Sequence, residues 1–161
     1  MIATLSMKVP PRWAEFDAVR DRSLEFLRRN DVATDPCIAV AMVVSELVEN
    51  AAKYGTFRRG SDAIEIAVTL AHTVITIEIC NPLGPNQTCH VTRLDGMIQW
   101  IRGFQDPFEA YLERLKEVSA QTLDSSESGL GLVRIAYEGQ AVLDFFVREQ
   151  NILAVSAVHR L

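Results

Sequence analysis

The stretch "SELVENAAKYG", Ser45 to Gly55, ends the most regular helical pattern in the chain. The pattern opens at "TDPC", where Asp35 is a candidate N-cap and Pro36 suits the first helical position, and Gly55 suits its end. Apolar residues at helical spacing predict one buried stripe: Val40, Val43, Val44, Leu47, Val48 and Ala51. At 3.6 residues per turn, four polar residues fall within about 100° on the opposite arc: Glu46, Glu49, Asn50 and Lys53.

Strands are predicted on both sides of this helix. Residues Thr4 to Val9 have the pattern of a short edge strand that ends at Pro10-Pro11. The segment "WAEFDAVRDRSLEFLRRN" then predicts a first helix, whose apolar spacing includes Trp13 and Phe16. Downstream, "AIEIAVTLA" and "VITIEI" alternate apolar and polar residues around His72-Thr73, which predicts a hairpin with one buried face.

The second half of the chain alternates helical and extended patterns. Residues 81–90 are predicted to form a loop, and 91–120 two helical segments separated at Asp106-Pro107. A glycine turn at 129–131 leads into a short helix that stops at Gly139, and a closing hairpin turns at Gln150-Asn151. This order predicts one α+β domain over residues 1–161, a two-layer α/β sandwich whose mixed, mostly antiparallel sheet is covered on one face by helices.

Composition narrows the class of protein. The chain has 161 residues, 48% of them hydrophobic, so it can bury a core without metal or disulfides. A net charge of -5 argues against a nucleic-acid partner, which needs a basic surface. No apolar run reaches the length that spans a bilayer, so we expect a cytoplasmic protein without a membrane partner. The three cysteines lack metal-ligand spacing and are expected to be reduced thiols: Cys37, Cys80 and Cys89.

Two motifs in a fixed order carry a resemblance to a known family. They are the Glu46-x-x-x-Asn50 helix that ends in Lys53-Tyr54-Gly55, and the "GLGL" turn of residues 129–132. Together they resemble the histidine-kinase-like (GHKL) ATPase superfamily, and within it the anti-sigma-factor serine kinases and SiaB-type partner-switching kinases. A lone GLGL is a weak motif, whereas the ordered pair is fairly specific. The resemblance implies a Bergerat-type ATP-binding fold.

The resemblance also implies ATP and Mg²⁺ as cofactors. The amide oxygen of Asn50 would ligate Mg²⁺, which prefers oxygen donors, and Glu46 one turn earlier would be the catalytic residue beside the γ-phosphate. Lys53 and Tyr54 would reach phosphate or ribose. Glycine permits close backbone approach and a helix start attracts anions, so the phosphate-binding turn would consist of Gly129, Leu130, Gly131 and Leu132.

The adenine loop departs from the family pattern. Family members usually place Asp-x-Gly-x-Gly after the central hairpin, and the aspartate receives the adenine amino group. This chain has Asn81-Pro82-Leu83-Gly84-Pro85, in which only Asn81 aligns with that aspartate. An amide oxygen still accepts a hydrogen bond, so Asn81 is the implied adenine contact. The insert at about 91–125 is the implied helical lid.

Each motif also has a purely structural interpretation. In this interpretation the polar arc is an ordinary solvated helix face, on which Glu49 and Lys53, four residues apart, form an ion pair. The glycines at 129 and 131 have the spacing of a tight turn with Ser128 as N-cap. Asn50 favours a functional role, because asparagine is a poor helix former in the middle of a helix.

Two functional hypotheses from different classes follow. The first is an ATP- and Mg²⁺-dependent protein serine/threonine kinase of a partner-switching system, which binds and phosphorylates a STAS-domain anti-sigma-antagonist-like protein. The second is a non-catalytic regulator, with or without bound nucleotide, that sequesters a protein partner. A sigma factor or another regulator is a further candidate partner, and a homodimer is a candidate assembly.

Overall fold

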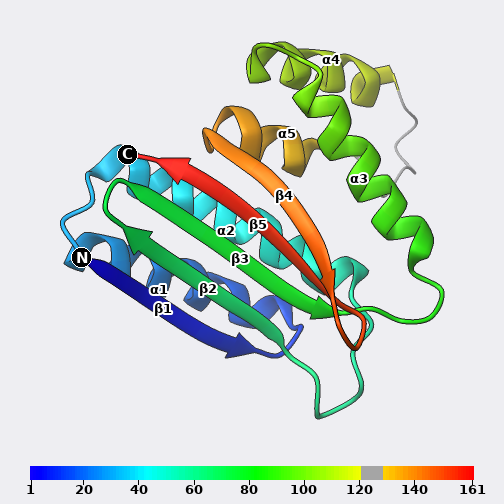
Figure 1. Ribbon diagram of the computed structural model, residues 1–161, viewed down its shortest axis with the longest axis horizontal. Coiled ribbons are helices and arrows are strands. Elements are labelled where there is room, and N and C mark those ends of the chain that lie inside the picture. The colour runs from blue at the N-terminus through cyan, green and yellow to red at the C-terminus, as the bar shows by residue number, and fades with distance from the viewer. Residues whose placement is uncertain (121–128) are drawn as a thin grey trace.

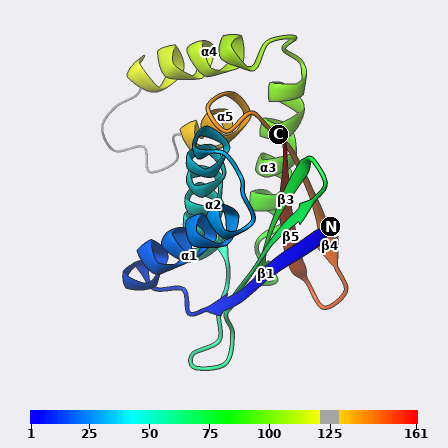
Figure 2. The same cartoon turned by 90° about the vertical axis from the view of Figure 1, so that its left-hand side faces the viewer.

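The computed structural model describes residues 1–120 and 129–161. Within them the strands form one sheet with the order β1-β2-β3-β5-β4, and helices cover one face of it, as Figures 1 and 2 show. This arrangement confirms the predicted α+β two-layer sandwich. The strands are β1 Ile2–Val9, β2 Ile64–Ala71, β3 Val74–Pro82, β4 Ala141–Arg148 and β5 Ile152–Arg160.

All strand pairs among the described residues are antiparallel, so the parallel component of the predicted mixed sheet is wrong for this part of the chain. The connections explain the difference. The helices α1, Phe16–Arg29, and α2, Thr34–Tyr54, run along the sheet and back again (Figure 1). As a result β2 starts beside the end of β1, with Ile64 opposite Val9.

The core lies between α2 and the sheet. The predicted stripe of α2 is buried throughout, and the alternating residues of the β2–β3 hairpin that face it are buried as well: Ile64, Ile66, Val68, Leu70, Ile75, Ile77 and Ile79. Successive side chains of a strand point to opposite faces, so Glu65, Thr76 and Glu78 lie on the open face of the sheet. Burial of the apolar face therefore fixes which way the polar arc of α2 points.

Three local predictions are corrected by the structure. The helix α2 begins at Thr34 with Ala33 as N-cap, so Asp35 lies in the first turn instead of capping it. Trp13 sits in a 3-10 turn, Trp13–Glu15, and its side chain is 64% exposed, so it is not part of the helix stripe. The loop predicted for 81–90 is shorter, because β3 continues to Pro82 and the next helix starts at Thr88.

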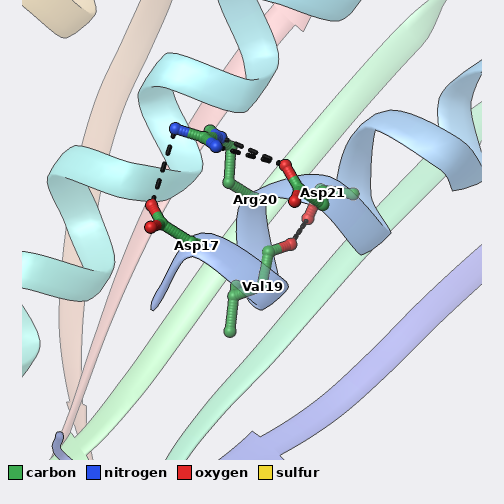
Figure 3. A network of polar contacts seen from close by, with 5 residues as sticks. Asp17, Val19, Arg20 and Asp21 are labelled. Atoms are coloured by element: carbon green, nitrogen blue, oxygen red, sulfur yellow. Dashed lines mark hydrogen bonds and ion pairs between the residues drawn. The ribbon is translucent and has the colours of Figure 1, made fainter. Parts of the chain in front are cut away.

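The outer face of α1 carries short-range ion pairs. Arg20 reaches the carboxylates of Asp17 and Asp21 at 3.6 and 3.2 Å (Figure 3). Such exposed pairs contribute little, typically 0–1 kcal/mol. One turn along, the buried Ser23 donates its hydroxyl to the carbonyl of Val19 at 2.9 Å, which satisfies a polar group that α1 brings into the core.

Three further helices extend the layer beyond β5 and β4. They are α3 Thr88–Arg102, α4 Pro107–Ala120 and α5 Leu130–Tyr137. The break between α3 and α4 falls at the predicted Asp106-Pro107, where Asp106 accepts the N–H of Phe108. The predicted insert of 91–125 extends past Ala120 into residues outside the described part, and its function as a lid stays a prediction. The candidate cap Ser128 also lies outside the described residues.

The edge strand β4 has part of its backbone already paired. Arg102 of α3 donates to the carbonyl of Leu143 at 2.7 Å, and the carboxylate of Asp144 accepts the N–H of Phe145 at 2.9 Å. Arg102 and Asp144 also approach each other at 3.7 Å. These contacts tie the end of α3 to the edge of the sheet.

Candidate functional site

A cavity of about 530 Å³ opens beside the polar arc of α2. Segments far apart in the sequence contribute to its wall: α2, the ends of β3 and β5, the helices α3 and α4, and the start of α5. Its apolar lining includes Leu47, Ile79, Leu94, Leu132 and Leu153. Its polar lining includes Glu46, Glu49, Asn50, Lys53, Tyr54, Asn81, His90, Arg93 and Arg114.

Glu46 is held by a residue from another element of the fold. Its Oε1 accepts a hydrogen bond from Nη1 of Arg134 on α5 at 2.7 Å, across 88 positions of sequence. Burial raises the pKa of the Glu46 carboxyl, the Arg134 guanidinium opposes that shift, and the carboxylates of Glu49 and Glu138 add to it. The side chain is 19% exposed, so the pair is a partly buried one.

The two glycines of the GLGL turn have separate reasons to be glycine. Gly129 adopts the left-handed conformation, with φ of 66°, which residues with a side chain rarely adopt. At Gly131 an added Cβ would lie 2.6 Å from Oε2 of Glu46. The Glu46 motif and the glycine turn therefore meet in space, and the carboxylate of Glu46 occupies the room that the missing side chain leaves.

Asn50 of α2 and Asn81 of β3 both line the cavity. Within residues 1–120 and 129–161 the side chain of Asn50 has no hydrogen-bond partner, so its amide is available to a ligand. Asn81 is buried in β3, and its Nδ2 donates to the carbonyl of Pro82 at 3.1 Å. That bond uses one of the two N–H donors of the amide, so Asn81 can offer its oxygen and its second N–H to other neighbours.

Lys53 and Tyr54 belong to a stack at the rim. The rings of Tyr54 and His90 stack with centroids 4.2 Å apart, and Nζ of Lys53 lies 5.1 Å from the Tyr54 centroid. Gln87 donates to the carbonyl of Tyr54 and accepts the N–H of Gly84, which ties the end of α2 to the loop before α3. The sequence prediction placed Lys53 and Tyr54 at the cavity but had no signal for His90.

The structure brings together all but one of the predicted site residues. The exception is Leu130, which packs against the hydrophobic core and is absent from the lining of the cavity. The side chain of Ile135, farther along α5, is fully buried. Sequence reasoning missed Arg134, although it is the one charged residue inside the apolar run "LGLVRIAY". It also missed Arg93 and Arg114, whose signal is hidden in helices of mixed polarity.

The described residues contain neither a metal-ligand cluster nor a membrane-spanning helix. In ranges 1–120 and 129–161 no three His, Cys, Asp or Glu side chains come together as a metal site. Over the same ranges, none of the helices combines the length and apolarity needed to cross a membrane. Any divalent cation at Asn50 would therefore need ligands from a bound molecule and water as well.

Comparisons with known proteins complete the description. The fold is similar to that of a solved chain. That chain comes from the crystal structure of the SiaB-SiaC complex from Pseudomonas aeruginosa, with a TM-score of 0.72 and 18% sequence identity. The match covers 96% of this chain and 88% of the other, so it spans both layers, α3 and α4 included. No protein-family model and no curated protein sequence matches this chain.

Proposed function

We propose that this chain is a protein kinase of a partner-switching system, which binds ATP with Mg²⁺ in the cavity and phosphorylates a serine or threonine of a STAS-domain partner. The observation that carries the proposal is the meeting of the Glu46–Asn50 arc and the GLGL turn around one cavity. Its volume, about 530 Å³, falls in the range of roughly 300–1,000 Å³ that is typical of small-molecule sites.

The lining fits the parts of a nucleotide. Apolar side chains from α2, β3 and β5 suit a flat base, and the oxygen of Asn81 would accept the adenine amino group beside them. Lys53, Arg93 and Arg114 bring positive charge to the same cavity, as phosphates require. The amide oxygen of Asn50 is a hard donor of the kind that Mg²⁺ prefers, and the phosphates and water would supply the other ligands.

The residues of the chain would then have distinct roles. Bound Mg²⁺-ATP would supply the phosphoryl group and neutralise charge during transfer. Asn50 would hold the metal, and the start of α5 would face the phosphates. Glu46 would accept the proton of the incoming hydroxyl, a contribution of about 10² to 10⁴ in rate for general-base catalysis.

A protein acceptor is supported by one comparison. The solved chain of similar fold belongs to a complex, SiaB with SiaC. The exposed Trp13 at the cavity wall adds a second argument, because tryptophan is enriched among residues that dominate protein interfaces.

A second function is favoured by one contact. The ion pair with Arg134 occupies Oε1 of Glu46 and opposes the rise of its pKa, which suits a regulator that binds a partner without phosphorylating it.

Calorimetry with Mg²⁺-ATP, followed by incubation with labelled ATP and a candidate STAS-domain protein, separates the kinase from the sequestering regulator. We expect transfer by the wild type, its loss in Glu46→Gln with nucleotide affinity kept, and a much milder effect of the matched control Glu49→Gln. Nucleotide binding without transfer to the partner would favour the sequestering regulator, and absence of binding would overturn the nucleotide site.

A further inference from the structure

The guanidinium of Arg134 lies behind the cavity and not in it. Its Nη1 donates to Glu46 at 2.7 Å and its Nε donates to Glu138, one helical turn farther along α5, at 3.0 Å. Arg134 is not among the residues that line the cavity, whereas Glu46 is. A residue in this place reaches a ligand only through the carboxylate that it holds.

Both oxygens of Glu46 are constrained by α5. Arg134 holds Oε1, and Oε2 lies where a Cβ of residue 131 would be, so a single helix sets the direction of the carboxylate. The hydrogen bond from a planar guanidinium fixes direction better than a point charge does. Glu138 restricts the guanidinium from its other side, because an arginine bound by two carboxylates loses much of its rotational freedom.

We propose that Glu138, Arg134 and Glu46 form a positioning chain, in which Arg134 holds the carboxylate of Glu46 in one orientation against the cavity. The inference deepens the proposed function, on which the role of Glu46 as a base depends. Arg134 is a positioning residue, since it acts through Glu46.

The electrostatics of the site give this chain a measurable signature. Charged groups from four helices surround Glu46. Glu49 and Lys53 from α2, Arg93 from α3 and Arg114 from α4 line the cavity, whereas Arg134 and Glu138 of α5 act on the carboxylate from outside the lining. The Arg134 cation lowers the pKa of Glu46 against the effect of burial. Without that cation, the remaining influences are burial and the carboxylates of Glu49 and Glu138, and each of them raises the pKa of Glu46.

The test is an NMR titration of the full chain without metal or nucleotide, with the Glu46 carboxyl carbon assigned by its absence in Glu46→Gln. In Arg134→Gln we expect the Glu46 midpoint to rise by about one pH unit or more, as for loss of an opposite charge at this distance. The matched control Arg148→Gln breaks a comparable pair on the open face of the sheet and should leave the midpoint unchanged. An unchanged midpoint in folded Arg134→Gln overturns the inference.

A second variant separates orientation from charge and also serves if Arg134→Gln does not fold. Arg134→Lys keeps the cation but loses the planar contact with two carboxylates. We expect a near-normal Glu46 midpoint, unchanged Mg²⁺-ATP affinity and at least about a tenfold lower rate of partner phosphorylation, since misplaced catalytic groups cost that much or more. A full rate in Arg134→Lys would overturn positioning. The titration needs neither nucleotide nor partner, so it tests the contact between Arg134 and Glu46 even if the kinase proposal fails.

Discussion

Two arginine–glutamate pairs lie on opposite faces of the sheet, and they differ in what surrounds them. The Arg134–Glu46 pair lies on the helical side, against a cavity and a glycine. The Arg148–Glu78 pair lies on the open face, beside Cys80 and the ring of Phe146. Their glutamate side chains are similarly exposed, at 19% and 29%. An arginine–glutamate pair therefore indicates a functional site only when a cavity or another functional group lies beside it.

The largest expected effect comes from filling the space at Gly131. In Gly131→Val the new side chain must push the carboxylate of Glu46 toward the cavity, where it would repel phosphate and break the pair with Arg134. We expect Mg²⁺-ATP affinity to fall by more than about a hundredfold, which corresponds to about 3 kcal/mol. Calorimetry measures the affinity, and circular dichroism checks that the protein is folded.

A matched glycine sharpens this prediction. Gly96 lies in α3, and an added Cβ there would meet no atom within 4 Å. Gly96→Ala should leave nucleotide affinity unchanged and stabilise the helix by up to about 1 kcal/mol. Equal affinity losses at both glycines would mean that Gly131 has no special relation to the site. The resemblance implied that Gly131 lets a phosphate approach the backbone. In the structure, the space beside Gly131 accommodates the carboxylate of Glu46 instead.

The next effect concerns Asn50. In Asn50→Ala we expect Mg²⁺-ATP affinity to fall by about tenfold to a hundredfold, the loss expected for one polar contact with a charged group. Metal-free ATP should lose much less, because it lacks the ion that the amide would hold. Calorimetry with and without Mg²⁺ gives the two values, and equal losses would assign Asn50 a structural role. The melting temperature should not fall, since alanine is the better helix former.

A smaller effect is expected for Asn81→Asp, and it has two parts. A carboxylate accepts the adenine amino group but repels the oxygen that guanine carries at the same ring position, whereas an amide can donate to that oxygen, so preference for ATP over GTP should sharpen. Stability should fall by about 1–3 kcal/mol, because the buried side chain loses its donor to the Pro82 carbonyl. Competition binding and urea unfolding measure the two parts. An unchanged ATP-to-GTP ratio would remove Asn81 from base recognition.

The smallest effect is expected on the open face. Arg148→Gln should change stability by no more than about 1 kcal/mol and leave Mg²⁺-ATP binding unaltered. Its signature is chemical: burial raises the pKa of Cys80 to about 11, and Arg148 opposes that shift. Since only the thiolate reacts, loss of the cation should slow alkylation of Cys80 at pH 9, while the exposed Cys89 is unaffected. Mass spectrometry of labelled peptides distinguishes the two thiols.

The sequence predicted the parts of this molecule that depend on local periodicity. The apolar stripe of α2 and the alternation of the β2–β3 hairpin are confirmed, because burial of one face imposes a fixed period. Local periodicity could not predict that β1 and β2 pair antiparallel, because their relative direction depends on how the two helices between them turn. Helix starts were also misplaced, as at Asp35, because several residues near a helix end satisfy the same cap pattern.

The candidate site shows the same division. Motifs predicted the residues on α2 and in the glycine turn, since each motif is local. Arg134 and His90 were missed, because their partners, Glu46 and Tyr54, are distant in sequence and only the tertiary structure brings them together. A charge inside an apolar helix, as at Arg134, is the kind of local signal that points to such a partner.

The contacts of Arg102 and Asp144 on β4 affect how readily another strand could pair with this edge. An unpaired edge strand with exposed Val142, Phe146 and Val147 is a template for a foreign strand, which can extend the sheet into a fibre. Here an incoming chain would first have to displace the guanidinium from Leu143 and the carboxylate from Phe145. The last residue of α3, a helix that also forms one wall of the cavity, thus obstructs strand addition at the middle of the exposed edge.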